Sequence, residues 1–72
     1  MVDLKTITAE SIERIRKRLG YTHTELAEKL GINRTTLYLY ESGRRVLPTE
    51  LIYRLWINLG IEPNEVLGIA KD

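Results

Sequence analysis

The sequence predicts an all-α fold, and three kinds of local signal support this prediction. Apolar residues recur at steps of three and four, which is the spacing of a buried helix face. Thr or Asn residues stand in front of these segments as candidate N-caps. Glycines follow them, at positions where a left-handed residue ends a helix. The chain has 72 residues, enough for one small core, so we expect a single domain spanning residues 1–72.

The first expected helix covers about residues 9–19, after a lead-in segment at 1–7. Thr8 precedes this helix as its N-cap, and Ile7 packs on Ile12 as a hydrophobic staple. Its inward residues are Ile12, Ile15 and Leu19. The lead-in segment fits an arm, a short strand or a frayed end.

The second expected helix covers residues 23–30. Thr22 and Glu25 have the spacing of a capping box, which marks the start of this helix, and Gly31 marks its end. Ala27 lies beside its apolar face, and a side chain this small lets another helix cross closely.

The third expected helix begins at Arg34 and ends near Gly43. Asn33 is its N-cap, and Ile32 before the cap packs on Leu37 as a hydrophobic staple. Its buried residues are Leu37 and Tyr40. Its exposed residues are Arg34, Thr35, Tyr38 and Leu39. Two short helices joined in this way are typical of a helix-turn-helix, and such an exposed face suits a DNA major groove.

Two further helices are expected after a loop at 42–48. They cover residues 49–59 and 63–67, and a loose tail follows at 68–72. The expected buried residues of the longer helix are Leu51, Ile52, Leu55, Trp56 and Leu59. The complete prediction is therefore five helices.

From about residue 12 to residue 67 the chain resembles the lambda-repressor-like, Cro/C1-type helix-turn-helix domains. The resemblance is carried by I-R-K-R-L-G-Y-T-H-T-E-L-A-E-K-L-G-I-N-R-T-T-L-Y-L-Y-E-S-G-R-R at 15–45 and by L-G-I-E-P-N-E-V-L at 59–67. It implies five helices in one compact unit, of which the second and third read DNA. Double-stranded DNA is therefore the expected partner.

Four residues of the third helix are candidate base readers. The guanidinium of Arg34 matches O6 and N7 of guanine with two parallel hydrogen bonds. Thr35 bonds a base edge or offers its methyl group to thymine, and Tyr38 reaches a base or a phosphate, or covers the rim of the core. Leu39 departs from the polar residue that family members often have there, which leaves a thymine-methyl contact or a core role.

The candidate phosphate contacts lie around this helix. They are His23, Asn33, Thr36, Arg44 and Arg45. His23 stands where the family usually has glutamine, at a helix N-terminus that favours anions. We expect protonation of His23 to strengthen DNA binding as pH falls through about 6.5.

The resemblance also implies a structural salt bridge between Arg16 and Glu41. In the family, an arginine four residues before the glycine that ends the first helix pairs with an acid at the end of the recognition helix. This pair is expected to fix the third helix against the first. The other basic residues of the first helix are expected to form a solvated face.

The charge distribution agrees with a nucleic-acid partner. Residues 14–45 carry eight basic and three acidic side chains, a balance of +5, although the whole chain carries only +1. Positive charge is therefore centred on the segment that would touch phosphate.

The amino-acid composition argues against several other classes of function. The chain has no cysteine and one histidine, so we expect no disulfide, no metal site and no cofactor. No catalytic constellation or glycine-rich phosphate loop is present, so we expect neither an enzyme nor a small-molecule ligand. The amino terminus has acid where a signal peptide needs base, and apolar runs are short, which predicts a cytoplasmic protein without a membrane segment.

The sequence thus predicts a sequence-specific DNA-binding protein, a small repressor-type transcriptional regulator that reads the major groove with its third helix. Tyr53, Ile57 and Ile69 are candidates for a homodimer surface that would match a palindromic operator, and incidental surface apolar residues are the alternative. A second function class is a protein-interaction module, such as an antitoxin, which binds a partner protein through the face of the 49–59 helix.

Overall fold

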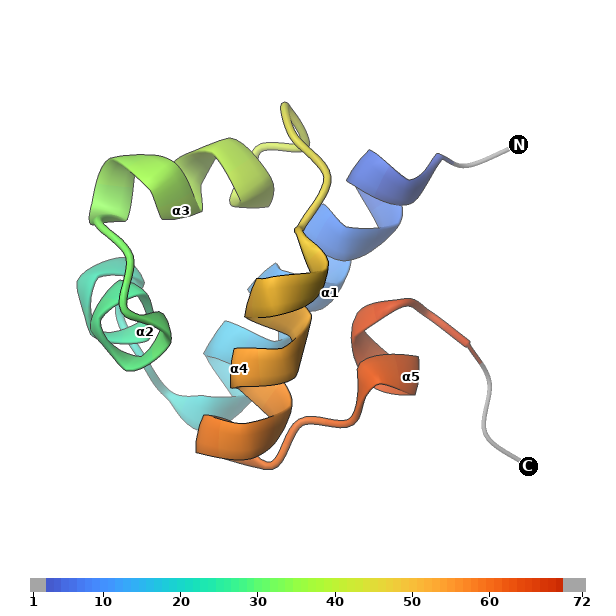
Figure 1. The fold of residues 1–72 in the computed structure, drawn as a ribbon. Coiled ribbons are helices and arrows are strands. Elements are labelled where there is room, and N and C mark those ends of the chain that lie inside the picture. Colours follow the sequence, from blue (N-terminus) through green and yellow to red (C-terminus); the bar gives the residue numbers. More distant parts are fainter. Residues whose placement is uncertain (1–2, 70–72) are drawn as a thin grey trace.

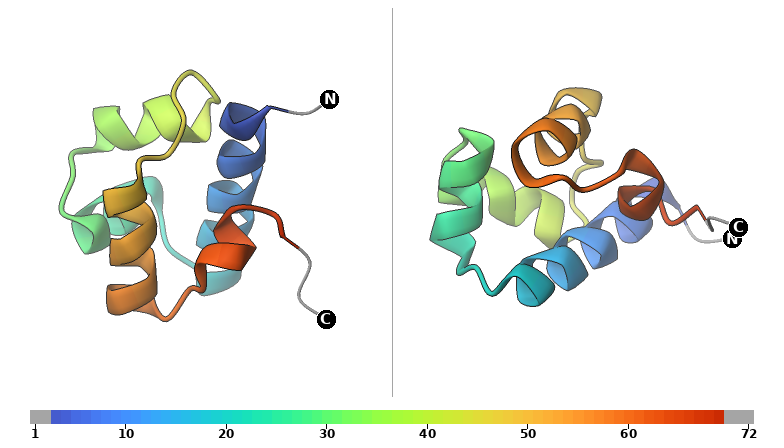
Figure 2. Two further views of the ribbon diagram at one scale, coloured as in Figure 1. Left: turned by 45° about the vertical axis from the view of Figure 1, so that its right-hand side comes forward. Right: turned by 90° about the horizontal axis from the view of Figure 1, so that it is seen from below.

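The computed structural model describes residues 3–69, which fold into five helices without a strand (Figure 1). The helices are α1 (Leu4–Leu19), α2 (His23–Leu30), α3 (Arg34–Glu41), α4 (Thr49–Leu59) and α5 (Pro63–Val66). This order confirms the predicted all-α architecture. Helices α2 and α3 lie together on one side of the molecule, and α5 lies against α1 on the other (Figure 2).

Helix α1 begins earlier than the sequence predicted. Asp3 is its N-cap, and the Asp3 carboxylate accepts a hydrogen bond from the backbone N of Thr6 at 2.9 Å. Aspartate is among the strongest N-cap residues, so this signal outweighs the later one at Thr8. The expected lead-in segment at 1–7 is therefore wrong for residues 4–7, and residues 1–2 lie outside the described part of the chain.

Thr8 has a different role from the predicted cap. It lies inside α1 and is buried. Its hydroxyl donates to the backbone O of Leu4 at 2.9 Å and accepts from the backbone N of Leu47 at 3.4 Å, so it links α1 to the segment before α4. Ile7 lies within α1 rather than before its cap, which removes the predicted staple. Leu19, expected to face inward, is 36% exposed at the last turn.

The core joins apolar residues from all five helices. Its fully buried members are Ile12, Ile15, Leu26, Leu30, Leu37, Leu55 and Val66. Burial of each such side chain stabilises the fold by about 1.5–3 kcal/mol before the conformational entropy cost is subtracted. None of the helices within residues 3–69 combines the length and the apolar composition that crossing a bilayer requires.

The start of α2 and the turn between α2 and α3 are built as predicted. Thr22 and Glu25 form both bonds of the capping box, at 2.8 and 3.1 Å. Gly31 ends α2 with φ of 70°, and Asn33 caps α3 by accepting from the backbone N of Thr36 at 2.7 Å. Helix α4 adds a contact that local signals do not contain, because Arg54 Nη1 donates to the backbone O of Leu30 at 2.7 Å.

Gly31→Ala should destabilise the protein more than Gly20→Ala. Both glycines have positive φ, 70° and 73°, and a left-handed alanine costs about 1–2 kcal/mol. Only at Gly31 would the added Cβ lie 3.2 Å from Arg54 Nη1, whereas nothing lies within 4 Å of the one at Gly20. Urea unfolding of the two variants measures the difference. Equal losses of unfolding free energy would mean that Arg54 moves aside freely.

Helix α4 differs from its prediction at Trp56. Leu51 and Leu55 are buried and Ile52 and Leu59 are partly buried, but Trp56 is 50% exposed. The helix presents Leu51 and Leu55 to the core, and Trp56 lies one turn after Ile52 at the edge of that face. It lines an apolar groove between α4, α5 and the start of α1, and the prediction of a buried Trp56 is wrong.

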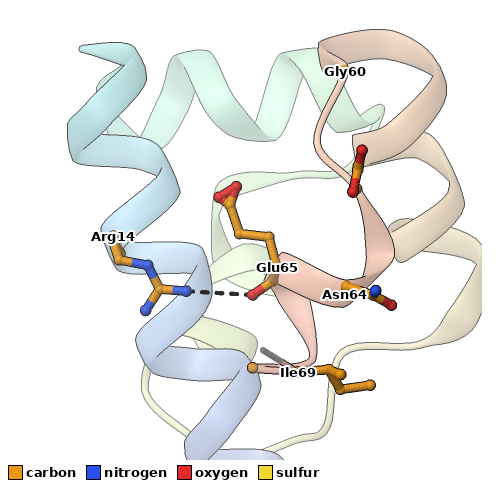
Figure 3. Close-up of a pocket in the computed structure, with 7 residues that line it drawn as sticks. Arg14, Gly60, Asn64, Glu65 and Ile69 are labelled. Atoms are coloured by element: carbon orange, nitrogen blue, oxygen red, sulfur yellow. Dashed lines mark hydrogen bonds between the residues drawn. The ribbon is translucent and has the colours of Figure 1, made fainter. Parts of the chain in front are cut away.

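Helix α5 is attached to α1 by two arginines that were expected to be solvated. Arg14 donates from Nη2 to the backbone O of Glu65 at 3.3 Å, beside a surface cavity of about 600 Å³ (Figure 3). Arg18 makes a two-pronged pair with the Glu65 carboxylate at 2.6 and 2.8 Å. Leu67 is the C-cap of α5 rather than its last residue. Of the expected loose tail only Gly68 and Ile69 are described, and Ile69 N donates to the backbone O of Asn64 at 2.8 Å.

Candidate nucleic-acid interface

One side of α3 is buried and the other carries the predicted base readers. Leu37 is completely buried and fixes the helix on the core. Arg34, Thr35 and Tyr38 are exposed, and the three side chains border a shallow hollow of about 310 Å³. Leu39 is half-buried, so it lies between the core and this surface. The structure therefore presents a guanidinium, a hydroxyl and a phenol together on one face of a short helix.

The loop after α3 extends this face with positive charge. The backbone N atoms of Arg44 and Arg45 both donate to the backbone O of Leu39, at 3.0 and 3.1 Å, which folds the loop back on the end of the helix. The Arg44 guanidinium lies 5.9 Å from the centre of the Tyr38 ring, in a cation–π arrangement. Arg44, predicted as a phosphate contact, thus lies beside a predicted base reader.

Asn33 and Thr36 lie at the start of the same helix. The Asn33 side-chain oxygen is used by the cap bond to Thr36 N. Its amide NH₂ remains the polar group that an incoming phosphate would meet. Asn33 is exposed and Thr36 is half-buried.

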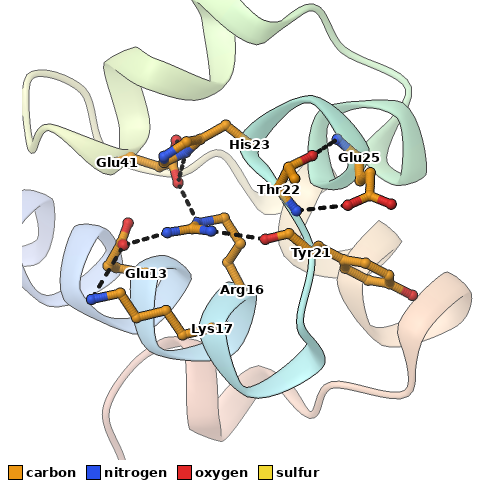
Figure 4. A network of polar contacts seen from close by, with 8 residues as sticks. All are labelled: Glu13, Arg16, Lys17, Tyr21, Thr22, His23, Glu25 and Glu41. Carbon is orange, nitrogen blue, oxygen red and sulfur yellow. Dashed lines mark hydrogen bonds and ion pairs between the residues drawn. The ribbon is translucent and has the colours of Figure 1, made fainter.

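Behind this face, Glu41 gathers charged groups from α1 and α2 (Figure 4). Its side chain is only 6% exposed. Arg16 Nε lies 3.5 Å from Glu41 Oε2, and His23 Nδ1 lies 2.8 and 2.9 Å from the two carboxylate oxygens. The structure therefore brings Arg16 and Glu41 together, and adds the histidine, which sequence reasoning had assigned to phosphate alone.

Arg16 connects this cluster to two other groups. Its Nη2 donates to Glu13 Oε1 at 2.6 Å, and its Nη1 donates to the backbone O of Tyr21 at 2.8 Å. The hydrogen bond from Arg16 holds the pKa of the Glu13 carboxyl below its ordinary value, and Lys17 and His23 add smaller effects. Arg16 Nε is buried without a hydrogen bond among the described residues, so Glu41 is its charge partner.

Comparison with known proteins agrees with this geometry. The family model described as helix-turn-helix matches residues 12–66. The chain belongs to this helix-turn-helix family. Its matched segment includes α2, α3 and the turn between them, so the family match and the observed pair of helices coincide.

Two relatives have names that refer to transcription. A protein of Methanothermobacter thermautotrophicus, named an uncharacterized HTH-type transcriptional regulator, is 39% identical over 57 residues, which cover 79% of this chain and 83% of that protein. A Pyrococcus furiosus protein, provisionally named an HTH-type transcriptional regulatory protein, is 37% identical over 49 residues. That match covers 68% of this chain and only 16% of the Pyrococcus protein. No solved structure matches the chain.

The charged cluster around Glu41 raises the question of whether this helix-turn-helix domain could bind a metal ion. No metal site was expected from a single histidine without cysteines, but the structure brings Glu13 and Glu41 to His23 from other helices, and ligand atoms of the three residues lie within 4.8 Å of one another. The Arg16 guanidinium already bonds Glu13 and pairs with Glu41. Because Arg16 together with Lys17, which lies 3.7 Å from Glu13, balances the two carboxylates, the cluster is better described as an ion-pair network than as a metal site.

The predicted dimer residues are exposed but do not share one cavity. Tyr53 and Ile57 on α4 are 56% and 58% exposed, and Ile69 is 55% exposed. Tyr53 and Trp56 line the apolar groove, whereas Ile69 lines the cavity between α1 and α5. Trp56 is the residue of this helix-turn-helix domain that sequence reasoning missed, because it had been placed in the core.

Stability of the helix-turn-helix domain should fall in acid through Glu13 and Glu65. Hydrogen bonds from Arg16 and Arg18 hold the pKa values of these two carboxyls below their ordinary value of 4.5. A lowered pKa in the folded state contributes stability that is fully present above 4.5 and is lost as pH falls through the lowered value. Urea unfolding at pH 7 and at pH 3 measures this loss. Glu65→Gln should reduce the difference between the two pH values, and Glu28→Gln, at an exposed position on α2, should leave it unchanged.

Proposed function

We propose that this chain is a sequence-specific double-stranded-DNA-binding protein, a small repressor-type transcriptional regulator that reads the major groove with α3. The observation that carries the proposal is the exposed group of Arg34, Thr35 and Tyr38 on a helix fixed by a buried Leu37. Membership of the helix-turn-helix family supports it. We assign the chain no catalytic role and no cofactor, and a cytoplasmic location is part of the proposal.

Base recognition would use three kinds of chemical group on the exposed face of α3. Arg34 begins α3, so its guanidinium extends from the first turn and can donate two hydrogen bonds to guanine. Thr35 offers a hydroxyl and a methyl group, and Tyr38 offers a phenol. Half-buried Leu39 would contribute a contact with a thymine methyl at most through its exposed edge.

Phosphate binding would use the groups that flank the helix. Asn33 and Thr36 lie at its N-terminus, where the partial positive charge of the helix favours anions. Arg44 and Arg45 follow its C-terminus, and His23 begins α2. These contacts carry no sequence information by themselves, but they fix the orientation in which the base readers enter the groove.

A homodimer on a palindromic site is the arrangement that we propose for this regulator. Two copies related by a two-fold axis would place their α3 helices about 34 Å apart, one turn of DNA. The apolar groove that includes Tyr53 and Trp56 has a volume of about 380 Å³, and no charged side chain of the described residues lines it. Its neighbour Ile57 supports α4 as the contact surface, since Ile57 is also exposed.

The same groove supports the second candidate function, in which a partner protein covers α4. An antitoxin-like module would bind that partner through Tyr53 and Trp56, and DNA would be a secondary ligand. Trp56→Glu distinguishes the two proposals. If the groove joins two copies, this variant should be a monomer by sedimentation and should bind a half-site as well as the unchanged chain does, but a palindrome more weakly.

Selection of bound sequences from a random double-stranded DNA pool tests the main proposal. The expected result is one enriched motif with two inverted halves, whose centre-to-centre spacing is about 10 base pairs. Binding to this motif should weaken steeply with added salt, because phosphate contacts release counterions. A pool that is not enriched after repeated selection at low salt would contradict sequence-specific binding.

A further inference from the structure

The contact between His23 and Glu41 determines which nitrogen of the imidazole faces outward. Nδ1 lies 2.8 and 2.9 Å from the two oxygens of the Glu41 carboxylate. A carboxylate that pairs with an arginine has only acceptors to offer, so Nδ1 must carry a hydrogen and donate. In a neutral imidazole the other nitrogen, Nε2, then carries a lone pair and no hydrogen. Only the protonated ring has an N–H group at Nε2.

The exposed side of this pair belongs to the interface. The His23 side chain is 44% exposed and the Glu41 side chain 6%. Both residues line a hollow of about 310 Å³ that also includes Arg34 and Tyr38 of the reading face. A DNA backbone that follows the hollow would therefore meet Nε2 while α3 lies in the groove.

We propose that His23 takes up a proton when the protein binds DNA, and that Glu41 is the positioning residue that imposes this requirement. The inference rests on the DNA-binding function proposed above. A neutral His23 held by Glu41 presents a lone pair to a phosphate oxygen, which is repulsive. The imidazolium presents an N–H donor and a positive charge to the phosphate and keeps its bond to Glu41.

The charges around His23 allow this uptake of a proton. The hollow at the ring is lined by Glu41, Arg34 and the Tyr38 phenol of α3 and by Glu13 of α1. Arg16 and Lys17 of α1 pair with these two carboxylates. Three basic side chains, Arg16, Lys17 and Arg34, stand against two carboxylates, so this set carries a formal charge of about +1 before DNA arrives. A phosphate adds negative charge at Nε2, and added negative charge favours the protonated ring.

DNA affinity should then depend on pH through one proton per chain. When binding takes up one proton, the dissociation constant changes by up to tenfold per pH unit over the range in which the free histidine is neutral. We expect binding of the selected site to strengthen about tenfold between pH 8 and pH 6 at constant ionic strength. Glutamine donates at every pH, so His23→Gln should bind with little change over the same range.

Fluorescence anisotropy with the selected site, from pH 6 to pH 8.5, measures this dependence for the full chain, His23→Gln and Glu41→Gln. Glu41→Gln should still bind but with a smaller pH dependence, because an amide can also donate to Nδ1 and so allow a neutral ring with Nε2–H. The chain has one histidine, so ¹⁵N NMR of its imidazole reports the tautomer directly. At pH 8 the free protein should show hydrogen on Nδ1, and bound DNA at pH 7 should convert the ring to imidazolium.

Two results would overturn the inference while leaving DNA binding intact. One is an equal affinity at pH 6 and pH 8 for the unchanged chain. The other is a pH dependence that persists in His23→Gln, which would place the proton elsewhere. If Glu41→Gln does not fold, the tautomer of the unchanged chain still decides, since hydrogen on Nε2 at pH 8 contradicts the proposed role of Glu41. Failure to bind any DNA at every pH would overturn the proposed function itself, and this inference with it.

Discussion

Arg34→Ala should bind the selected DNA site about ten- to hundredfold more weakly than the unchanged chain. A bidentate contact between an arginine and guanine discriminates against other bases by about 1–3 kcal/mol. Arg34 is exposed at the first turn of α3 and takes no part in the core, so the variant should keep the fold. Fluorescence anisotropy with the site and with random-sequence DNA measures the two affinities separately, and binding to random DNA should fall only slightly.

Arg45→Ala is the matched control for this prediction. Arg45 is also exposed and also basic, but it lies in the loop after α3. Loss of a phosphate contact should weaken binding to the site and to random DNA by similar factors, and should reduce the salt dependence by about one charge. If Arg34→Ala behaved in the same way as Arg45→Ala, Arg34 would be a phosphate contact, and base reading would have to be assigned to other residues.

The start of α2 and the turn between α2 and α3 were predictable because their signals are local. A capping box, an N-cap asparagine and a left-handed glycine each act within a few residues of the chain, and each forms the expected bond. The start of α1 was missed although its signal is equally local. Asp3 and Thr8 are both good N-caps. The Asp3 bond to Thr6 N is local, whereas the use of the Thr8 hydroxyl by Leu47 N depends on the distant segment before α4.

The position of Trp56 depends on tertiary structure. Periodicity places Ile52 and Trp56 on one stripe of α4, but the width of the buried face depends on how the neighbouring helices pack against α4, which contacts α2 and α5. Those helices leave the groove open at Trp56. A core residue and a groove residue have the same sequence pattern, so the pattern alone could not separate them.

The charged cluster around Glu41 also contains a contact that the sequence alone could not predict. The pairing of Arg16 with Glu41 was expected from family resemblance, whereas the approach of His23 to Glu41 joins residues 18 positions apart. Nothing in the spacing of these residues indicates that contact. It changes the expected chemistry of the histidine, because one ring nitrogen is occupied before any DNA is present.

Arg16→Ala should lower the free energy of unfolding by about 3 kcal/mol. Removing one partner of a buried ion pair costs about 3–5 kcal/mol, because the other charge is left buried without compensation. Arg16 is 15% exposed and Glu41 6% exposed, but Glu13 is 36% exposed and can turn toward water, and Glu41 keeps its contact with His23, which favours the lower end of this range. Small domains have only about 5–15 kcal/mol of stability, so the loss should be evident in urea unfolding.

Lys17→Ala is the matched control, since Lys17 lies on the same helix, 3.7 Å from Glu13, and is 70% exposed. Its loss should change stability by less than about 0.5 kcal/mol. The stability of Arg16→Lys should lie between those of Arg16→Ala and Lys17→Ala, because one ammonium cannot reach Glu13, Glu41 and the Tyr21 carbonyl with the geometry of a guanidinium.

The order of preference among variant DNA sites should be the same for folded Arg16→Lys and the unchanged chain, because Arg16 lies behind α3 and supports it without touching bases. Unchanged stability of Arg16→Ala, or an altered base preference of Arg16→Lys, would contradict this structural role.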